Sequence, residues 1–144
     1  MRSHSVYYQE ACDALTQLES NFVNISLADR YRLLYTIIRR ALLASLLKAG
    51  YEENLLEKAT AHYVLAKLKQ TSPHALLDDL VGFVETFERG IITVAYMDDH
   101  LKEKPSQLLT KQVRKVLQSL HEIYLSDLPA PTTPASPGNA MKLF

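Results

Sequence analysis

The apolar residues of this chain recur with the spacing of α-helices along most of its length. They lie three, four and seven positions apart, alternation of apolar and polar residues is nearly absent, and only four glycines occur in 144 residues. A period of 3.6 residues places such positions on one side of a helix, whereas a strand needs a period of two. The pattern predicts an all-α fold of five helices.

The first helix is predicted over residues 5–22, and the second begins after Ser26. Ser26 is followed three residues later by Asp29, which is the spacing of an N-terminal capping box. The second helix is expected to end at Gly50, because glycine adopts the left-handed C-cap conformation without a steric penalty. This helix is apolar on most of its faces, so we expect it to be central.

A third helix is predicted over residues 54–70, with Asn54 as its N-cap. A fourth is predicted over residues 72–99. There Ser72 would cap the helix and Pro73 would take the first helical position, where a missing N–H costs nothing.

The fourth predicted helix contains two glycines, and the fifth is the most regular. Gly82 and Gly90 each weaken a helix by about 1 kcal/mol relative to alanine, so they would mark close helix contacts or a kink near Gly90. The fifth helix runs from near Pro105 to Leu128. Its apolar stripe consists of Leu109, Val113, Val116, Leu117, Leu120, Ile123 and Tyr124.

Five helices with short connections predict an up-and-down bundle, formed by residues 1–128 as one domain. The second and fourth helices are the most apolar, so they should form the inner pair, and surplus apolar surface on them would make a homodimer. Residues 129–144 are rich in proline, serine and threonine without an apolar period. Such a segment buries too little surface to offset its ordering entropy, which predicts a disordered tail.

Composition narrows the class of protein. Lys plus Arg and Asp plus Glu each number 16, so no global field draws the chain onto nucleic acid, although net neutrality does not exclude a local basic cleft. The single cysteine, Cys12, allows no intrachain disulfide, and no secretory signal is recognisable, which together favour a reducing, cytoplasmic location. Arg39 and Arg40 interrupt the longest apolar run, so no membrane span is predicted.

The common signatures of catalysis and cofactor binding do not occur in the sequence. No Ser-His-Asp spacing and no phosphate-binding glycine loop stands out. His62, His74 and His121 are dispersed, and the Asp98–His100 cluster is typical of a solvated helix end. We therefore predict neither a metal nor a cofactor.

Basic residues are the strongest candidates for binding. Arg39 and Arg40 lie on the second helix, where either a binding surface or a solvated helix edge explains them. Arg89 and Tyr96 are seven residues apart and share one side of the fourth helix. Arginine binds phosphate well, and tyrosine donates hydrogen bonds or stacks. The alternative is that Arg89 pairs with Glu85 while Tyr96 caps the core.

Three stretches resemble the HEPN family of helical bundles, which occur in prokaryotic toxin–antitoxin and defence systems. They are "YRLLYTIIRRALLASLLKAGY", "EKATAHYVLAKL" and the region from "FERGIITVAYMDDH" to "LHEIYLSDL", together spanning about residues 29–128. In active members an arginine, four residues, a histidine, one residue and a tyrosine form a motif that cuts RNA at a dimer cleft without metal. Here Arg89 and Tyr96 match that motif, but Val94 occupies the histidine position and Gly90 the polar position after the arginine.

The resemblance implies a non-catalytic module that dimerises and binds a partner, such as a small nucleotidyltransferase that modifies Tyr96. One alternative is a metal-independent ribonuclease toxin that uses Arg89, or Arg114 together with His121. That second pair is seven residues apart on the fifth helix and fits the broad Arg-to-His gap of the family. A secretion or assembly chaperone is the other alternative, since small neutral helical proteins with spare apolar surface often serve that way.

Overall fold

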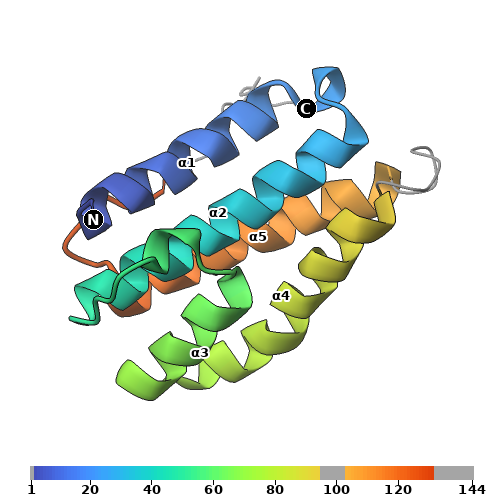
Figure 1. The fold of residues 1–144 in the computed structure, drawn as a ribbon. Coiled ribbons are helices and arrows are strands. Elements are labelled where there is room, and N and C mark those ends of the chain that lie inside the picture. Colours follow the sequence, from blue (N-terminus) through green and yellow to red (C-terminus); the bar gives the residue numbers. More distant parts are fainter. Residues whose placement is uncertain (1, 95–102, 132–144) are drawn as a thin grey trace.

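The computed structural model describes residues 2–94 and 103–131. Within these ranges the chain forms five α-helices and two short 3-10 helices, and no strand, which confirms the all-α class (Figure 1). The helices are α1 (His4–Ser20), α2 (Leu27–Lys48), α3 (Ala61–Thr71), α4 (Ala75–Val94) and α5 (Glu103–Tyr124), and the 3-10 helices are Phe22–Asn24 and Leu56–Lys58.

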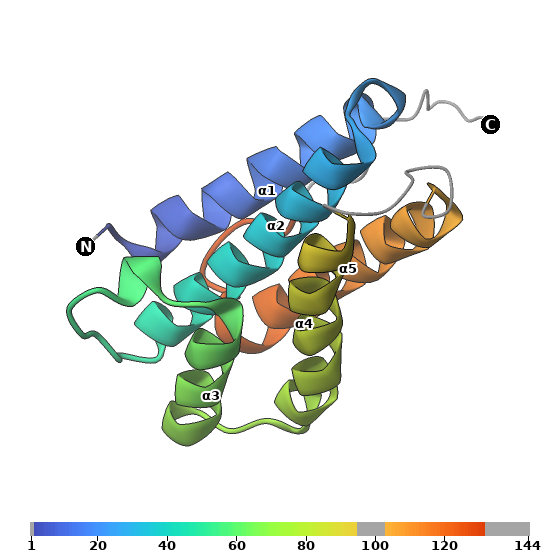
Figure 2. The same cartoon turned by 45° about the vertical axis from the view of Figure 1, so that its right-hand side comes forward.

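The second helix is central, as its apolar sequence predicts. Twelve of its 22 residues are buried, and α2 packs against α1, α3, α4 and α5. Figures 1 and 2 show α1 on one side of α2 and α3 and α4 on the other, and Figure 1 shows α5 behind α2. The expected inner pair of the second and fourth helices is therefore a single inner helix with the others around it.

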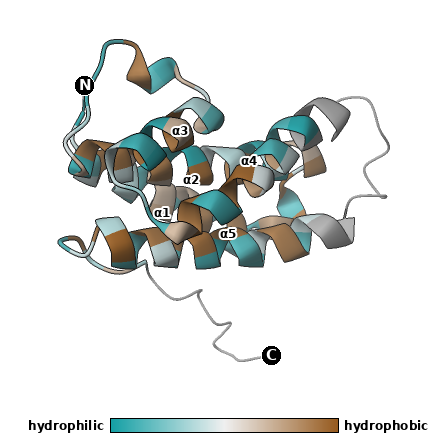
Figure 3. Ribbon diagram, turned by 90° about the horizontal axis from the view of Figure 1, so that it is seen from below, coloured by the Kyte–Doolittle hydropathy of each residue, from teal (hydrophilic) through white to brown (hydrophobic). Residues whose placement is uncertain are grey.

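The helices do not strictly alternate in direction. Figure 1 shows α1 and α2 running antiparallel and α4 returning against α5, but α2 and α5 run in the same general direction. The bundle is thus confirmed, and the expected up-and-down order is not. Figure 3 shows apolar and polar residues alternating along α4 and α5, as expected for helices with one buried side.

Both predicted ends of α2 are confirmed. The side chain of Ser26 accepts a hydrogen bond from the Asp29 backbone N–H at 3.2 Å. At the other end Gly50 has a φ of 96°, in the left-handed region. Its N–H donates to the Leu47 carbonyl at 3.0 Å, and the N–H of Tyr51 donates to the carbonyl of Leu46 at 3.2 Å. This is the Schellman arrangement that satisfies the last carbonyls of a helix.

The third helix begins later than its sequence pattern predicts. Leu55 has a φ of 69°, and Leu56 begins a 3-10 helix that buries its side chain in the core. Thr60, rather than Asn54, is the N-cap of α3, since its hydroxyl accepts from the Tyr63 N–H at 3.1 Å. The burial of Leu56 therefore overrides the local helical pattern.

The fourth helix begins at Ala75, and Ser72 is not its cap. Ser72 instead closes α3, and its carbonyl accepts a hydrogen bond from the Tyr124 hydroxyl of α5 at 2.7 Å. His74 takes the capping role, because its Nδ1 accepts from the Leu76 N–H at 3.0 Å. The proline that follows Ser72 lies before the helix rather than in it.

The glycines of α4 and the ends of α5 also differ from expectation. A Cβ placed at Gly82 would meet no atom within 4 Å, so this glycine does not mark a close helix contact. The helix continues through Gly90 to Val94, and the rest of the predicted segment, residues 95–99, lies outside the described residues. The helix α5 begins at Glu103, so Pro105 lies in its first turn, where a missing N–H is tolerated, and it ends at Tyr124 rather than at the predicted Leu128.

The chain after α5 is held against the bundle as far as residue 129. The carboxylate of Asp127 pairs with His4 at 3.0 Å and with Lys48 at 3.4 Å. The carbonyl of Pro129, the first residue of the predicted tail, accepts from the Tyr8 hydroxyl at 2.7 Å. Ordered contacts therefore extend just past the predicted boundary, and residues 132–144 of the predicted tail lie outside the described residues.

Candidate functional site

Two arginines of α2, Arg39 and Arg40, were predicted as binding residues, and both have partners within the molecule. The Arg39 side chain is half-buried, and its Nε donates to the Ala59 carbonyl at 2.7 Å, which holds the chain just before α3. Arg40 forms an ion pair with Glu10 of α1. Both guanidinium groups therefore serve to attach neighbouring segments to the central helix.

Arg30 has a structural role that the sequence analysis missed. Its side chain is buried, and its Nε donates to the carbonyls of Phe22 and Ile25, both at 2.9 Å. The guanidinium carbon lies 4.0 Å from the centroid of the Phe22 ring. The spacing in the sequence could have predicted this burial. Arg30 lies three residues after Leu27 and four before Leu34, which places it on the buried side of α2.

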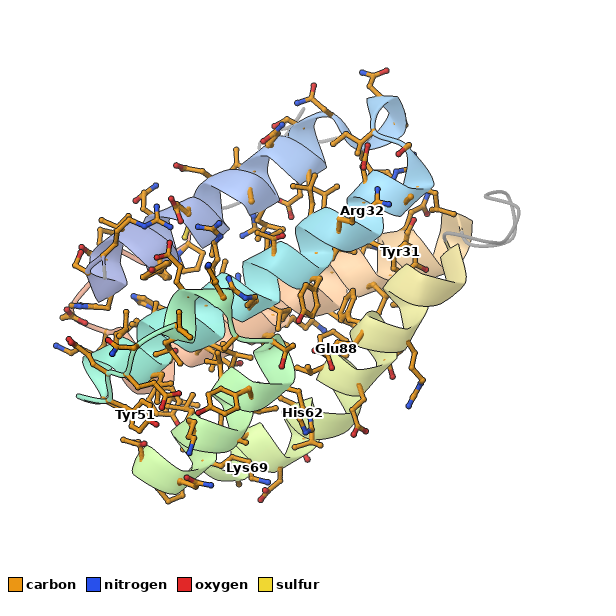
Figure 4. All side chains as sticks on the ribbon, viewed as in Figure 1. Tyr31, Arg32, Tyr51, His62, Lys69 and Glu88 are labelled. Atoms are coloured by element: carbon orange, nitrogen blue, oxygen red, sulfur yellow. The ribbon has the colours of Figure 1, made fainter. Side chains whose placement is uncertain are left out.

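Arg89 is exposed on α4, next to a residue that anchors this helix. The neighbouring Glu88 accepts from the Tyr35 hydroxyl at 3.0 Å, and the same hydroxyl accepts from the Ala61 N–H at 2.9 Å. Burial raises the pKa of Tyr35, so the hydroxyl stays protonated and links α2, α3 and α4. Figure 4 shows Glu88 on the inner side of α4. Tyr96, the other predicted residue, lies outside the described residues.

The second predicted pair, Arg114 and His121, is divided between two partners. Arg114 holds Glu19 of α1 through two bonds, from Nε at 2.8 Å and from Nη2 at 2.5 Å. The side chains of Arg114 and Glu19 are only 11% and 18% exposed. Such a bidentate pair fixes the guanidinium plane against the carboxylate.

His121 contacts the segment that follows α5. Its Nε2 lies 2.7 Å from the Leu128 carbonyl oxygen, and because a carbonyl only accepts, this nitrogen carries the hydrogen. The imidazole also stacks on Tyr8, with the ring centroids 5.8 Å apart. Burial raises the pKa of Tyr8. In this arrangement Nε2 of His121 is a donor and cannot accept a proton from a substrate.

Cys12 lies near Tyr8 and is half-buried, slightly less covered than a core position would be. Burial raises the pKa of its thiol. Because only the thiolate is a strong nucleophile, Cys12 is poorly suited to attack a substrate at neutral pH. Its side chain packs against the hydrophobic core instead.

A cluster of polar and aromatic side chains links the connection between α2 and α3 to α3 itself. Glu53 accepts hydrogen bonds from the hydroxyls of Tyr51, at 3.0 Å, and Tyr63. The Lys67 ammonium lies 5.9 and 5.4 Å from the centroids of these two rings. The Glu53 carboxylate raises the pKa of Tyr63 to about 12. Figure 4 shows Tyr51 beside α3, near the end of α2 where this connection begins.

A groove of about 610 Å³ lies between the end of α1 and the middle of α5. The end of α1 and the start of α5 lie toward the same end of the molecule (Figures 1 and 2). We call it the α1–α5 groove, and its lining residues are Glu19, Phe22, Gln107, Thr110, Lys111, Arg114, Lys115 and Gln118. Arg114, selected from the sequence for catalysis, therefore lies in this groove with its charge already matched.

The α1–α5 groove is positive although the chain as a whole is neutral. Its lining holds three cations, Lys111, Arg114 and Lys115, and one anion, Glu19, which leaves a net charge of +2. Both lysine side chains are exposed, whereas Arg114 and Glu19 neutralise each other. Sequence reasoning did not find this groove, because it joins residues about 90 positions apart.

No group of three or more His, Cys, Asp or Glu side chains that could hold a metal ion occurs in the described part of the chain. Likewise, none of the helices described is long and apolar enough to span a bilayer. No protein-family model, curated protein or solved structure matches the chain. The HEPN resemblance therefore depends on the sequence motifs alone.

Proposed function

We propose that this chain is a non-catalytic helical module that works by binding a protein partner. The observation that carries the proposal is the α1–α5 groove, an open, positively charged surface on an otherwise neutral molecule. Clefts lined by one sign of charge concentrate and orient partners of the opposite charge. An open groove beside an exposed helix face is suited to a protein segment.

The hydrogen bonds of the candidate catalytic side chains to structural partners support a role without catalysis. Arg114 is held by Glu19, and the Nε2 of His121 donates to a backbone carbonyl. Val94 stands where the HEPN-like motif would need a histidine, and an aliphatic side chain cannot transfer a proton. The contacts of Arg114 and His121 are better explained by structural roles than by RNA cleavage.

The proposal includes the HEPN-like kinship and a homodimer that acts in the cytoplasm. Arg89 is exposed on α4, five residues before Val94, as the spacing of the HEPN-like motif requires. Light scattering of the purified chain at tens of micromolar should give the mass of a dimer, and a monomer would contradict that part. If the partner is a nucleotidyltransferase, co-expression should add a nucleotide mass to the wild-type chain and not to Tyr96→Phe.

Two experiments test the absence of catalysis and the presence of a partner. Purified chain incubated with RNA in chelator should leave the RNA intact. Cleavage that is lost in Arg89→Ala, Arg114→Ala or His121→Ala would instead establish a ribonuclease.

The tagged chain, isolated from its own cells, should retain one protein in stoichiometric amount, and the two purified components should reconstitute the complex. A chain that remains alone in both steps would refute the proposal.

A further inference from the structure

We propose that the α1–α5 groove receives an acidic, amphipathic segment of the partner protein. This inference rests on the proposed function, since it names the surface that the partner occupies and the chemistry of the segment that occupies it.

The length of the groove fits a short helix or an extended peptide of similar length. Its α5 side runs from Gln107 to Gln118, which at 1.5 Å per residue is about 16 Å, or three helical turns. Amphipathic helices that dock in grooves use anchors on one side, spaced over two to three turns. The groove volume of about 610 Å³ has room for several such side chains.

Apolar surface lies both inside the groove and at its outer edge. Phe22 lines the groove and is fixed in place, because the Arg30 guanidinium covers one face of its ring at 4.0 Å. Leu108 is 57% exposed and lies three residues before Lys111, next to the groove side of α5. The aliphatic stems of the lysines add apolar contact below their charged ends. The partner segment therefore needs apolar anchors.

The charge of the groove selects the polar residues of that segment. Lys111 and Lys115 are one turn apart on α5, and both are exposed. Arg114 already has its carboxylate, so an incoming acidic residue meets the two lysines rather than the guanidinium. Charge complementarity of this kind steers association and fixes the register of the bound segment.

The same features favour a protein over RNA as the occupant. Single-stranded RNA is usually held by many cations along its backbone and by aromatic rings on which bases stack. Here two lysines are available, and the Phe22 ring is already covered on one face by Arg30. A peptide with a few carboxylates and apolar anchors makes fuller use of this surface.

A peptide library tests the inference without knowledge of the partner. The full chain is immobilised, and a random twelve-residue library displayed on phage is selected against it. Selected peptides should be enriched in Asp and Glu beside Leu, Ile or Phe. Their affinity is then measured by fluorescence anisotropy for the wild type, for Lys111→Glu/Lys115→Glu and for Leu108→Gln. Lys58→Glu is the matched control, because Lys58 is exposed on the connection before α3, away from the groove.

The double lysine reversal should weaken binding about tenfold or more, because two attractive charge pairs become repulsive. Leu108→Gln should weaken it about threefold, whereas Lys58→Glu should leave it unchanged. All these positions are exposed, so circular dichroism should show folded variants. A labelled single-stranded RNA of twelve nucleotides should bind at least tenfold more weakly than the peptides.

Three binding results would overturn the inference, and a complete failure to bind would overturn the proposed function with it. The first is selected peptides without acidic enrichment, and the second is peptides that bind the double lysine variant as well as the wild type. In that second case the partner-binding function stands, and only the groove is wrong as its location. A chain that selects no peptide and retains no protein from cells would refute both the groove and the partner-binding function. The third is RNA that binds more tightly than the peptides and depends on Lys111 and Lys115, which would replace the protein segment with nucleic acid.

Discussion

The ion pair between Arg114 and Glu19 provides the sharpest test of the structure, because it separates a structural arginine from a catalytic one. The two bonds of 2.8 and 2.5 Å join α5 to the end of α1, across 95 residues of sequence. The proposed perturbation is a double-mutant cycle of Arg114→Met, Glu19→Gln and the combination. Methionine keeps much of the apolar stem of the arginine and removes its charge.

The magnitude follows from the exposure of the two side chains. Exposed pairs contribute up to about 1 kcal/mol, and removal of one partner of a fully buried pair costs about 3–5 kcal/mol. At 11% and 18% exposure this pair lies nearer the buried limit, but Glu19 can still turn toward water, so we expect Arg114→Met to cost about 2–3 kcal/mol. The coupling between the two changes should be about 1.5–2 kcal/mol.

Urea unfolding of the four proteins at neutral pH, followed by circular dichroism, measures each free energy of unfolding. A coupling below about 0.5 kcal/mol would refute the reasoning, since such a value is typical of a solvent-exposed pair. In that case Arg114 would be open to ligands, and the charge of the α1–α5 groove would have to be revised. The charge-reversed pair Glu19→Arg/Arg114→Glu is a control, because it should recover part of the stability lost in either single reversal.

Three further predictions concern stability. Gly82→Ala should raise the free energy of unfolding by about 1 kcal/mol and the melting temperature by about 4 °C, because alanine favours a helix over glycine and its Cβ would meet no atom within 4 Å. Calorimetry measures the change, and a destabilised variant would show that the site is not open. Tyr35→Phe should cost about 1–2 kcal/mol in urea unfolding, since it removes the hydroxyl that receives the first N–H of α3 and donates to α4; an unchanged midpoint would show that this link is unimportant. The hydrogen bond from His4, reinforced by a lysine, lowers the pKa of Asp127, so this contact stabilises the fold above the ordinary carboxyl pKa and is lost as the pH falls through the lowered value. His4→Ala should raise the pKa of Asp127 toward its ordinary range in a carboxyl NMR titration, and an unmoved titration would exclude the contact.

The sequence predicted those features that depend on neighbours within one or two turns. The helical period located all five helices, and Ser26 and Gly50 marked both ends of α2. These are local signals, because a cap bonds to a residue two or three positions away and a left-handed glycine closes the turn beside it.

The local signals failed where a distant contact changed the preference. Asn54 was expected to begin α3, but the burial of Leu56 in the core breaks the chain into a 3-10 helix first. Ser72 was expected to cap α4, but it ends α3, and its carbonyl receives the Tyr124 hydroxyl of α5. Neither contact can be read from the residues nearby.

The predicted site residues illustrate the same limit. The sequence identified the basic residues worth examining but not their partners, and Arg40 pairs with Glu10, 30 residues away. The pairing of Arg114 with Glu19 also required the fold to bring α5 up to the end of α1, across 95 residues of sequence.

By itself, then, the sequence determined the helical class, the five α-helices of the described residues and the ends of the central one, because these depend on periodicity and on caps a few residues long. Only the tertiary structure decided which charges are neutralised and where a net positive groove remains. The physical reason is that a side chain's charge acts through the groups that packing brings within a few ångströms of it, and for Arg114 and Glu19 those groups come from opposite ends of the chain.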